Sequence, residues 1–535
     1  MSVWRFDESI YQIEPSLFLD SDGDGWGDLA GVTRQLSYIR SLGIGTVWLL
    51  PFFQSPFRDH GYDITNHMEV DPRFGGIADF VELLERAERL GMRVITELVM
   101  QHTSIDHPWF QSARSDRKSP FRDFYLWADD PPEDSPEPAF PDVEDSVWTW
   151  DEAAGQHYRH MFYSHEPDLD LANPRVREEM YRVMSYWLRL GVAGFRVDAV
   201  PYMVERAKRA DPDKDGLWLV EDMHRFARRR EPGAVLMGET DVHVDHYDDW
   251  LADGRRLTHL LDFYINNHLW LALARGKAAP LQEALRAHGK APSFSRHGMW
   301  LRNHDQLDLD QLSDGELDEV RAAFAPDPDM WVYGRGIRRR LGPMLGGDVD
   351  RIAMAHALLI SLPGVPIVRY GEEIGMGEDL SLPEREAVRT PMQWTPREHG
   401  GFSTASLDKL PAPPIDDGPF GYDKVNVEDQ AYREHSLLGR VRRMLHTRLA
   451  LQEFRGDCRE ARVDDPRVLA LRYDDGDEAC LLVFVNLSGD EVVFAVAEDV
   501  PACAIEVLCD KAYDKADLPA MSLGAHGYRW LRCVR

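Results

Sequence analysis

The sequence alternates short apolar, β-prone runs with longer segments of helical periodicity, and this alternation constrains the fold more than any other feature. Eight such runs are present, at 9–15, 44–51, 92–100, 192–200, 234–240, 259–266, 297–303 and 364–373. Segments between them, such as 77–91 and 176–191, repeat apolar residues with the period of an amphipathic helix. Fully apolar strands are typical of a parallel sheet buried on both faces. The sequence therefore predicts an α/β protein built on a (β/α)8 TIM barrel.

Two intervals are too long for a simple crossover between barrel strands. Residues 103–170 contain a proline- and acid-rich stretch followed by aromatic segments, which predicts an inserted domain B after the third strand. Residues 304–363 hold a second insertion. From about 456 the pattern changes to alternating strands, which predicts a C-terminal antiparallel β-sandwich over 456–535. The catalytic barrel is then assigned to residues 1–102 and 171–455.

Charge and cysteine usage restrict the partners and the compartment. The formal net charge of −31 argues against nucleic acid or an anionic membrane as a partner. The stretch MSVWRFDESIY lacks the features of a signal peptide, and no apolar run approaches transmembrane length. The five cysteines are odd in number and form no C-x-x-C pair, which favours free thiols over a disulfide framework. We expect a cytoplasmic protein that acts on a neutral small molecule, with a homo-oligomer left open.

Polar residues follow the predicted strands at the point where each strand ends. They are His102, Arg196, Asp198, Glu239, His304 and Asp305. Each acidic residue closes or interrupts an apolar run, where an unpaired carboxylate is costly to desolvate. A single one could be a structural ion pair, but three on the same face of a barrel favour catalysis. The C-terminal face of the strands is where barrel enzymes carry their active sites.

Three carboxyl groups and an arginine are typical of glycoside chemistry. A retaining enzyme uses one carboxylate as nucleophile and a second carboxyl group, about 5 Å away, as acid/base. Asp198 and Glu239 follow neighbouring barrel strands and could meet that distance. Arg196 lies two positions before Asp198, shares its inward face and would hold it ionised. Asp305 could bind sugar hydroxyls from the far side.

These segments resemble the conserved stretches of the α-amylase superfamily, glycoside hydrolase family 13, over nearly the whole chain. GFRVDAV resembles the nucleophile segment with Asp198, GET the acid/base segment with Glu239, and RNHDQ the segment whose Asp305 stabilises the transition state. HEPDLDLANP and VPIVRYGEEIGM resemble two further stretches. The resemblance implies a retaining α-glucosyl enzyme that needs no organic cofactor.

The resemblance also implies which residues hold the sugar. HGYDITNH supplies Tyr62 and Asp63, which in the family stack under and bind the non-reducing glucose. Arg389 of VRTPMQW is implied to pair with Asp63 and to close the pocket behind one glucose unit, as in exo-acting enzymes on short α-glucosides. His102 is implied to bind a sugar hydroxyl. The predicted substrate-binding residues are thus Tyr62, Asp63, His102, Arg196, His304 and Arg389.

Within this family the segment that begins LRNHDQLDLDQL and ends GIRRRLGPMLGGD is most similar to the trehalose synthase branch. Members of that branch isomerise maltose to trehalose by turning the released glucose in a closed pocket. Ala199 after the nucleophile is similar to the α-1,4-specific members. An α-glucosidase or a transglucosidase on α-1,4-linked disaccharides stays open, because pocket closure and water exclusion set that partition. A non-catalytic sugar-binding subunit is disfavoured, since such proteins would be expected to lose part of the acid triad.

The motifs depart from the family pattern at several positions. The usual D-x-V-x-N-H of the third strand reads ELVMQH, so Glu97 and Gln101 each carry one extra methylene. Both lie on one strand four positions apart and share a face. The usual Asp partnership with Arg196 must therefore be remade. EPDLD replaces QPDLN, and DQLD replaces DELT.

The stretch DSDGDGWGDLAG places an acidic residue at nearly every second position. A glycine-rich loop can wrap carboxylates around a hard cation. An EF-hand would need Glu at loop position 12, where Gly31 stands, and a solvated turn would leave four carboxylates in mutual repulsion. The stretch resembles the structural calcium loop of the oligo-1,6-glucosidase and trehalose synthase branch, although magnesium stays open. The implied ligands are the side chains of Asp20, Asp22, Asp24 and Asp28 and the carbonyl of Trp26.

Overall fold

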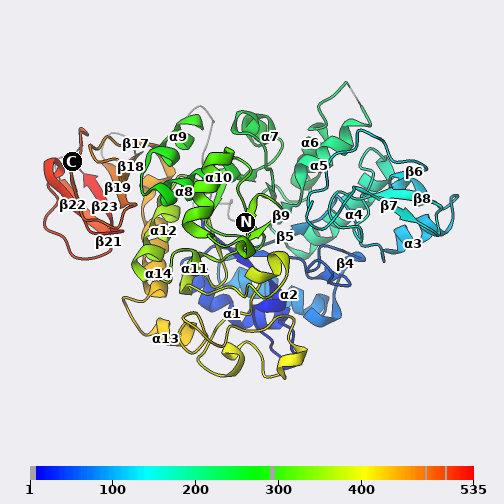
Figure 1. Cartoon of the computed structure of the whole chain (residues 1–535), viewed down its shortest axis with the longest axis horizontal. Helices are drawn as coiled ribbons and strands as arrows, with labels where there is room; N and C mark the ends of the chain where they lie inside the picture. The colour runs from blue at the N-terminus through cyan, green and yellow to red at the C-terminus, as the bar shows by residue number, and fades with distance from the viewer. Residues whose placement is uncertain (1–7, 212, 289–295, 476–478, 501–502, 535) are drawn as a thin grey trace.

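Eight parallel strands close into a barrel at the centre of the molecule (Figure 1). The computed structural model describes residues 8–211, 213–288, 296–475, 479–500 and 503–534. The strands follow one another around the barrel in chain order, and all their pairings are parallel. They are β1 (Ile10–Ile13), β2 (Thr46–Leu49), β5 (Arg93–Leu98), β9 (Gly194–Val197), β10 (Val235–Gly238), β11 (His259–Leu261), β12 (His297–Trp300) and β16 (Val365–Arg369). Each lies within one of the eight predicted runs, so the predicted barrel is confirmed.

Helices cover the outside of the barrel because the strands are apolar on both faces. The main ones are α1 (Leu29–Ser41), α2 (Ile77–Arg89), α4 (Pro174–Leu190), α6 (Trp218–Arg228), α8 (Phe263–Arg275), α12 (Val349–Ser361) and α14 (Leu437–Ala450). Shorter helices are α5 (Val200–Lys208), α7 (Tyr247–Leu251), α9 (Ala279–Ala287), α11 (Leu341–Met344) and α13 (Val427–Ala431). The apolar residues of α2 and α4 that face the strands are buried, as their helical periodicity predicts.

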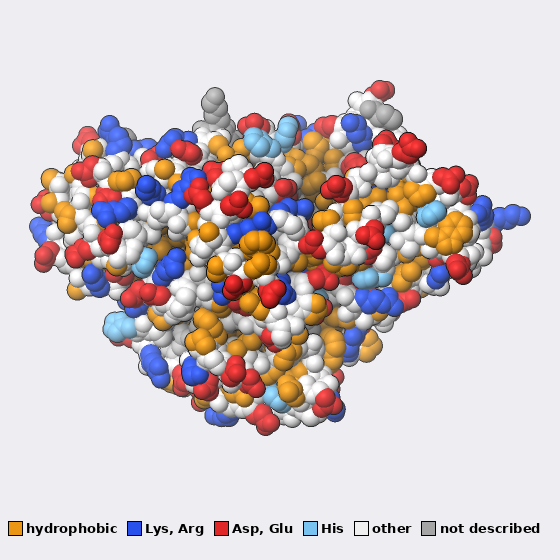
Figure 2. Space-filling model, in the orientation of Figure 1, with side chains coloured by type: hydrophobic (Ala, Val, Ile, Leu, Met, Phe, Trp, Pro, Cys, Tyr) orange, Lys and Arg blue, Asp and Glu red, His pale blue; other side chains and the backbone are white. Residues whose placement is uncertain are grey.

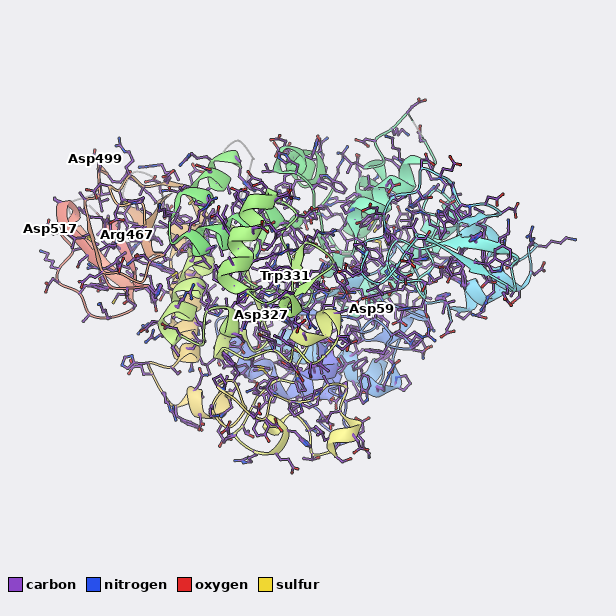
Figure 3. The ribbon with its side chains drawn as sticks, viewed as in Figure 1. Asp59, Asp327, Trp331, Arg467, Asp499 and Asp517 are labelled. Carbon is purple, nitrogen blue, oxygen red and sulfur yellow. The ribbon has the colours of Figure 1, made fainter. Side chains whose placement is uncertain are left out.

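Two excursions leave the barrel at the C-terminal ends of its strands. Between β5 and α4 lie α3 (Pro108–Ser115) and a sheet of β6 (Trp127–Ala128), β8 (Gln156–Arg159) and β7 (Trp148–Asp151), at the right of Figure 1. After β12 come α10 (Asp314–Phe324) and a small sheet of β13 (Leu307–Asp308), β15 (Gly336–Ile337) and β14 (Trp331–Val332). Trp331, labelled in Figure 3, packs its ring under Arg321 of α10. A ribbon of β3 (Phe53–Gln54) and β4 (Asn66–Val70) follows β2.

The last part of the chain forms two antiparallel sheets. The five-stranded sheet runs β17 (Asp457–Glu460), β18 (Val468–Asp475), β19 (Ala479–Asn486), β23 (Tyr528–Val534) and β21 (Cys503–Cys509). The two-stranded sheet pairs β20 (Val492–Phe494) with β22 (Met521–Leu523). Alternate residues of β19 belong to two different cores. Val483 packs in the main core with the barrel, whereas Phe484 packs with Phe494 of β20.

The surface carries charged side chains of both signs. On the face drawn in Figure 2, acidic and basic side chains are interspersed. None of the described helices is both long and apolar enough to span a membrane. The four cysteines whose side chains are described carry free thiols.

Candidate active site

One buried guanidinium joins the carboxyl groups that follow three neighbouring strands. Arg196 of β9 places Nη1 2.9 Å from Oε2 of Glu97 and Nη2 2.6 Å from Oε1 of Glu239. Nη1 also pairs with Oδ1 of Asp198. Glu97 receives a second bond from the indole nitrogen of Trp48, at 2.7 Å. Glu97 is one methylene longer than the usual Asp, and it was expected to disturb the ion pair with Arg196. In the structure Glu97 pairs directly with Arg196.

The backbone after Asp198 turns sharply to aim an N–H group at Glu239. Ala199 has φ 49° and ψ 40°, a left-handed conformation that is costly for a residue with a Cβ atom. Its N–H donates to Oε2 of Glu239 at 2.9 Å. Asp198 and Glu239 are thus held in place by the same short segment at the ends of β9 and β10.

Three carboxyl groups share the single positive charge of Arg196. Burial and the charges of Glu239 and Glu97 raise the pKa of Asp198 well above its usual range, although Arg196 opposes them. Burial likewise raises the pKa of Glu97 to about 7. Arg196 favours the ionised form of Asp198, while burial and the two neighbouring acids oppose it.

Asp305 has the opposite surroundings. Its carboxylate lies 3.0 Å from Nε2 of His304, 2.7 Å from Nη1 of Arg385 and 3.1 Å from Nη2 of Arg389. Burial would raise the pKa of Asp305, but His304 and the two arginines hold it below its usual range. Arg385 also binds both oxygens of Asp59 at 2.9 Å. Asp305 is therefore an ionised carboxylate across a wide pH range.

The three predicted catalytic carboxyl groups face one cavity of about 310 Å³. Figure 3 marks Asp59, one of its lining residues, near the centre of the molecule. Aromatic side chains of the first excursion and of α5 contribute apolar wall, among them Phe140, Phe162 and Tyr202. Polar hydroxyl-binding groups on an apolar wall are typical of a sugar site.

The predicted pair between Asp63 and Arg389 is wrong. Asp63 is fully buried and accepts from the hydroxyl of Ser55 at 2.7 Å. Among the described carboxylates, the partners of Arg389 are Asp305 at 3.1 Å and Asp59 at 4.0 Å. The sharp turn over residues 57–61 brings Asp59, four positions earlier, to the cavity in place of Asp63.

The other predicted residues divide into two groups. Tyr62 and His102 line the cavity, and burial lowers the pKa of His102 to about 3, so its imidazole is neutral. Arg196, His304 and Arg389 are buried behind the cavity wall and contact the carboxyl groups that line it. His304 also bonds to Tyr62, whose hydroxyl lies 2.7 Å from its Nε2.

Sequence reasoning missed seven charged residues of the cavity wall. They are Asp59, Glu166, Asp241, Asp308, Asp310, Arg335 and Arg385. Asp59 lies in a turn and Arg385 in the short 3-10 helix Glu384–Val388, and neither segment has the periodicity of a strand or an α-helix, so nothing local predicted that they meet. Glu166 did carry a signal, because it is the acidic residue of EPDLD where the family has Gln.

The acidic loop before α1 brings three of its four carboxylates together. Ligand oxygens of Asp20, Asp22 and Asp28 lie within 4.8 Å of one another. Asp24 bends back to accept from the N–H of Trp26 at 2.8 Å. Asp28 also caps α1 by accepting from the N–H of Gly31 at 2.6 Å. The oxygen-only set suits a hard cation such as Ca²⁺.

A closed barrel that gathers paired carboxyl groups around a cavity at the C-terminal ends of its strands is an enzyme of glycosidic bonds. The family of the alpha amylase catalytic domain matches residues 12–316 and 330–456, and the chain belongs to this alpha-amylase family. The chain is 39% identical, over 98% of its length, to the trehalose synthase of Thermus thermophilus, and it spans 55% of that protein.

Two further comparisons agree with this assignment. The chain is 42% identical to the trehalose synthase/amylase TreS of Mycolicibacterium smegmatis, over 87% of this chain and 80% of that protein. The crystal structure of an alpha-amylase from H. orenii superposes with a TM-score of 0.80 at 26% identity, covering 99% of this chain and 100% of that one.

Proposed function

We propose that the protein isomerises maltose to trehalose by retaining α-glucosyl transfer. The observation that carries this proposal is the Arg196-linked pair of Asp198 and Glu239 at one cavity. Similarity of about 40% to trehalose synthases supports the choice of substrate and product. The acidic net charge supports a neutral sugar rather than nucleic acid as the partner.

In this mechanism Asp198 attacks the anomeric carbon while Glu239 gives its proton to the glycosidic oxygen. A covalent glucosyl–Asp198 ester and free glucose result. The glucose turns within the cavity, and Glu239 removes the proton from its anomeric hydroxyl. That oxygen then attacks the anomeric carbon of the glucosyl unit, the bond from this carbon to the Asp198 oxygen breaks, and the carboxylate of Asp198 leaves as the 1,1-linked product forms. Asp305, ionised among its cationic neighbours, would stabilise the developing oxocarbenium charge.

Substrate binding would be shared by the lining residues. Asp59, oriented by Arg385, and the neutral His102 would bind hydroxyl groups of the donor glucose, with Tyr62 under its ring. Isomerisation requires that water, the competing acceptor, be kept from the ester. Access of water would give the second candidate function, an α-glucosidase, which the same residues could perform.

Product analysis tests this function. The protein is incubated separately with maltose, trehalose, sucrose and isomaltose, and the products are separated and quantified. We expect trehalose from maltose, with glucose as a minor product. Glucose alone from maltose would assign the protein as an α-glucosidase instead.

The variant Asp198→Asn tests the nucleophile. The amide keeps the shape of the carboxyl group but cannot form the ester, so turnover of maltose should fall at least about 1,000-fold. The matched control Asp310→Asn removes an acidic group from the cavity mouth without touching the ester-forming position. Unchanged turnover in Asp198→Asn would remove this residue from the mechanism.

We further propose that the acidic loop holds a structural Ca²⁺ through Asp20, Asp22 and Asp28. Burial raises the pKa of Asp28, and a bound cation would stabilise its ionised form. The ion would fix the loop between β1 and α1 without contacting the sugar.

Calorimetry with and without chelator tests the ion. A ligand that binds only the folded state adds about 2.7 kcal/mol of stability at one hundred times its dissociation constant. We expect chelation to lower Tm in the wild type and to leave Tm unchanged in Asp22→Asn, which lacks one ligand. Loss of turnover at unchanged Tm would contradict a purely structural role.

A further inference from the structure

Glu166 is the one buried cavity-lining acid whose carboxyl group has no hydrogen-bond partner among the residues that the structure describes. The residue is 1% exposed, and its side chain belongs to the cavity wall. Neither of its oxygens accepts or donates a hydrogen bond within the described chain. A buried polar group in this condition costs free energy, which a ligand group placed against it would recover.

The charges around the cavity favour a cation as that ligand group. Eight carboxyl groups and two guanidinium groups line it. Both guanidinium groups are already engaged. Arg385 binds Asp59 and Asp305, and Arg335 lies 3.0 Å from both oxygens of Asp308. The nearby His102 is neutral, because burial lowers its pKa to about 3. The described protein therefore offers no unengaged cation to Glu166.

Asp241 is a second acid of the cavity wall that has no cationic partner among the described residues. Its carboxyl group accepts from the side-chain amide of Gln311 at 2.7 Å and forms no ion pair among the described residues. Burial and the charges of Asp308 and Asp310 raise the pKa of Asp241 to about 8. The wall thus carries acids that lack a cationic partner beyond the pair that would carry out the reaction, and a cation placed against them would favour their ionised forms.

We propose that the cavity takes an amino sugar, a glucose unit that carries a protonated amine, and that Glu166 is the residue that recognises the amine. This inference rests on the proposed glucosyl chemistry only in placing the sugar in this cavity. An ammonium group has three donors and a full charge, so it satisfies both oxygens of Glu166 and offsets the acidic wall.

The protonation of Glu166 supports the same assignment. Burial and the charges of Asp59 and Asp63 raise its pKa well above the usual range in the empty cavity. Glu166 is then protonated until an ammonium group arrives, and the ion pair forms as the carboxyl group gives up its proton. Binding of the ammonium form should therefore release a proton, whereas binding of glucose should not.

Titration calorimetry of the whole protein tests the proposal without requiring turnover. The probes are glucose and its 2-amino-2-deoxy, 3-amino-3-deoxy, 4-amino-4-deoxy and 6-amino-6-deoxy analogues at pH 7. We expect at least one analogue to bind about ten times more tightly than glucose, which corresponds to about 1.4 kcal/mol. Its apparent enthalpy should change with the ionisation enthalpy of the buffer, because a proton is released.

The variant Glu166→Gln separates a local contact from the general field of the cavity. The amide has nearly the same shape and no charge, so it should abolish the preference for the amino sugar while glucose binding stays within about threefold. Asp310→Asn removes one charge from an exposed position of the cavity wall and should retain the preference. Equal melting temperatures confirm that the variants are folded.

The inference is overturned if none of the four analogues binds the wild type more tightly than glucose. It is also overturned if the preference survives in Glu166→Gln. The products from maltose are measured on the same preparation. If trehalose forms but no amino sugar binds more tightly than glucose, this inference is wrong and the proposed function stands. If an amino sugar is preferred and Glu166→Gln removes that preference, this inference is supported whether the product is trehalose or glucose.

Discussion

At the residue scale, the number of positive charges around each carboxyl group sets its chemistry. Asp198 shares Arg196 with two other carboxyl groups, and its pKa is raised. Asp305 has the guanidinium groups of Arg385 and Arg389 beside it, and its pKa is lowered. The two acids therefore differ in protonation although they have the same side chain and similar burial.

Replacing Glu97 by Gln should extend activity to lower pH. The negative charge of Glu97 is among the causes that raise the pKa of Asp198, so its removal lets Asp198 ionise at lower pH. Ionised Asp198 is the reactive form, and kcat/KM for maltose should therefore decline at a lower pH in Glu97→Gln than in the wild type. The measurement is the pH dependence of kcat/KM, with Tm recorded in parallel. A decline at the same or a higher pH contradicts the coupling between the two acids.

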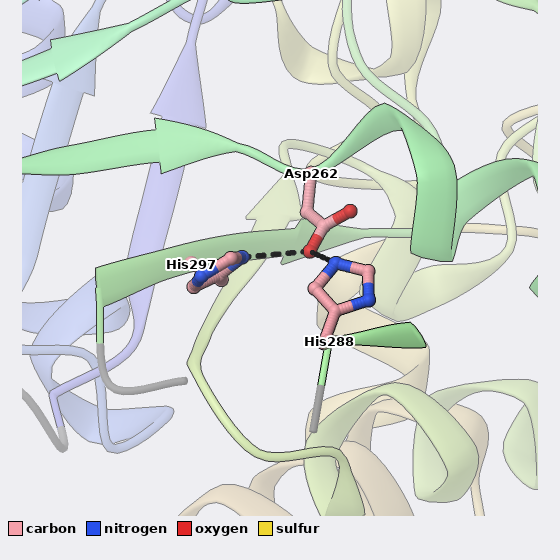
Figure 4. A group of neighbouring side chains, drawn as sticks. All are labelled: Asp262, His288 and His297. Carbon is pink, nitrogen blue, oxygen red and sulfur yellow. Dashed lines mark hydrogen bonds and ion pairs between the residues drawn. The ribbon is translucent and has the colours of Figure 1, made fainter. Parts of the chain in front are cut away.

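At the scale of elements, a buried polar cluster ties four barrel segments together. Asp262 follows β11 and caps α8 by accepting from the N–H of Ile265 at 2.9 Å. Its Oδ2 lies 2.8 Å from Nε2 of His288, after α9, and 2.8 Å from Nδ1 of His297 in β12 (Figure 4). The three side chains are fully buried. Oxygen–nitrogen separations of 2.8 Å match direct hydrogen bonds.

The cluster should make stability depend on pH with a definite sign. Although burial opposes both shifts, the histidines lower the pKa of Asp262 and Asp262 raises the pKa of His288. The lowered acid contributes stability above its unfolded pKa of about 4 and loses it as pH falls further. The raised base contributes fully below its unfolded pKa of about 6.5 and loses it as pH rises through the higher folded value. The contribution of the pair is thus largest between about pH 4 and 6.5.

The variant Asp262→Asn tests that sign. Removing one partner of a buried ion pair costs about 3–5 kcal/mol, or a Tm lower by several degrees at pH 6. The difference in Tm from the wild type should shrink as pH rises toward 9. Glu179→Gln, which breaks an exposed pair with Arg182, is the control and should change Tm little at either pH. A difference that grows with pH would contradict the assigned protonation.

At the scale of the whole molecule, one face of the five-stranded C-terminal sheet packs into the same hydrophobic core as the helices around the barrel. Val483 and Tyr473 of its barrel-facing side are fully buried in the same cluster as the barrel helices. The hydroxyl of Tyr473 donates to the carbonyl of Ser361 at the end of α12, at 2.6 Å. Removal of this sheet from the barrel would expose a broad apolar surface, so the two parts should unfold together.

Substituting Val483 by Asp should lower the melting temperature of the barrel and the sheet alike. A carboxylate at this buried position would be desolvated without a partner, and the cost should be about 3 kcal/mol or more. Val493→Asp on β20, where the side chain is 66% exposed, is the matched control and should leave the transition in place. Calorimetry should give a single transition at reduced temperature for Val483→Asp. Two separate transitions, with the barrel unchanged, would show that the parts are independent.

Sequence alone determined the elements and the acids that end them. Eight apolar runs and the helical periodicity between them predicted the barrel, because burial on both faces leaves a local signature in every strand. Asp198, Glu239 and Asp305 could be predicted for the same reason, since each closes an apolar strand and the fold places all strand ends on one face.

Only the tertiary structure decided how charges are shared across loops. The partner of Arg389 proved to be Asp305, with Asp59 near it, and Arg385 joined the site from a segment without periodicity. Glu166 was visible as an unusual acid, but its lack of a partner depends on every surrounding chain segment. Burial and strand order are encoded locally and repeat along the chain. Ion pairing among loops depends on distances in space, which no local pattern records.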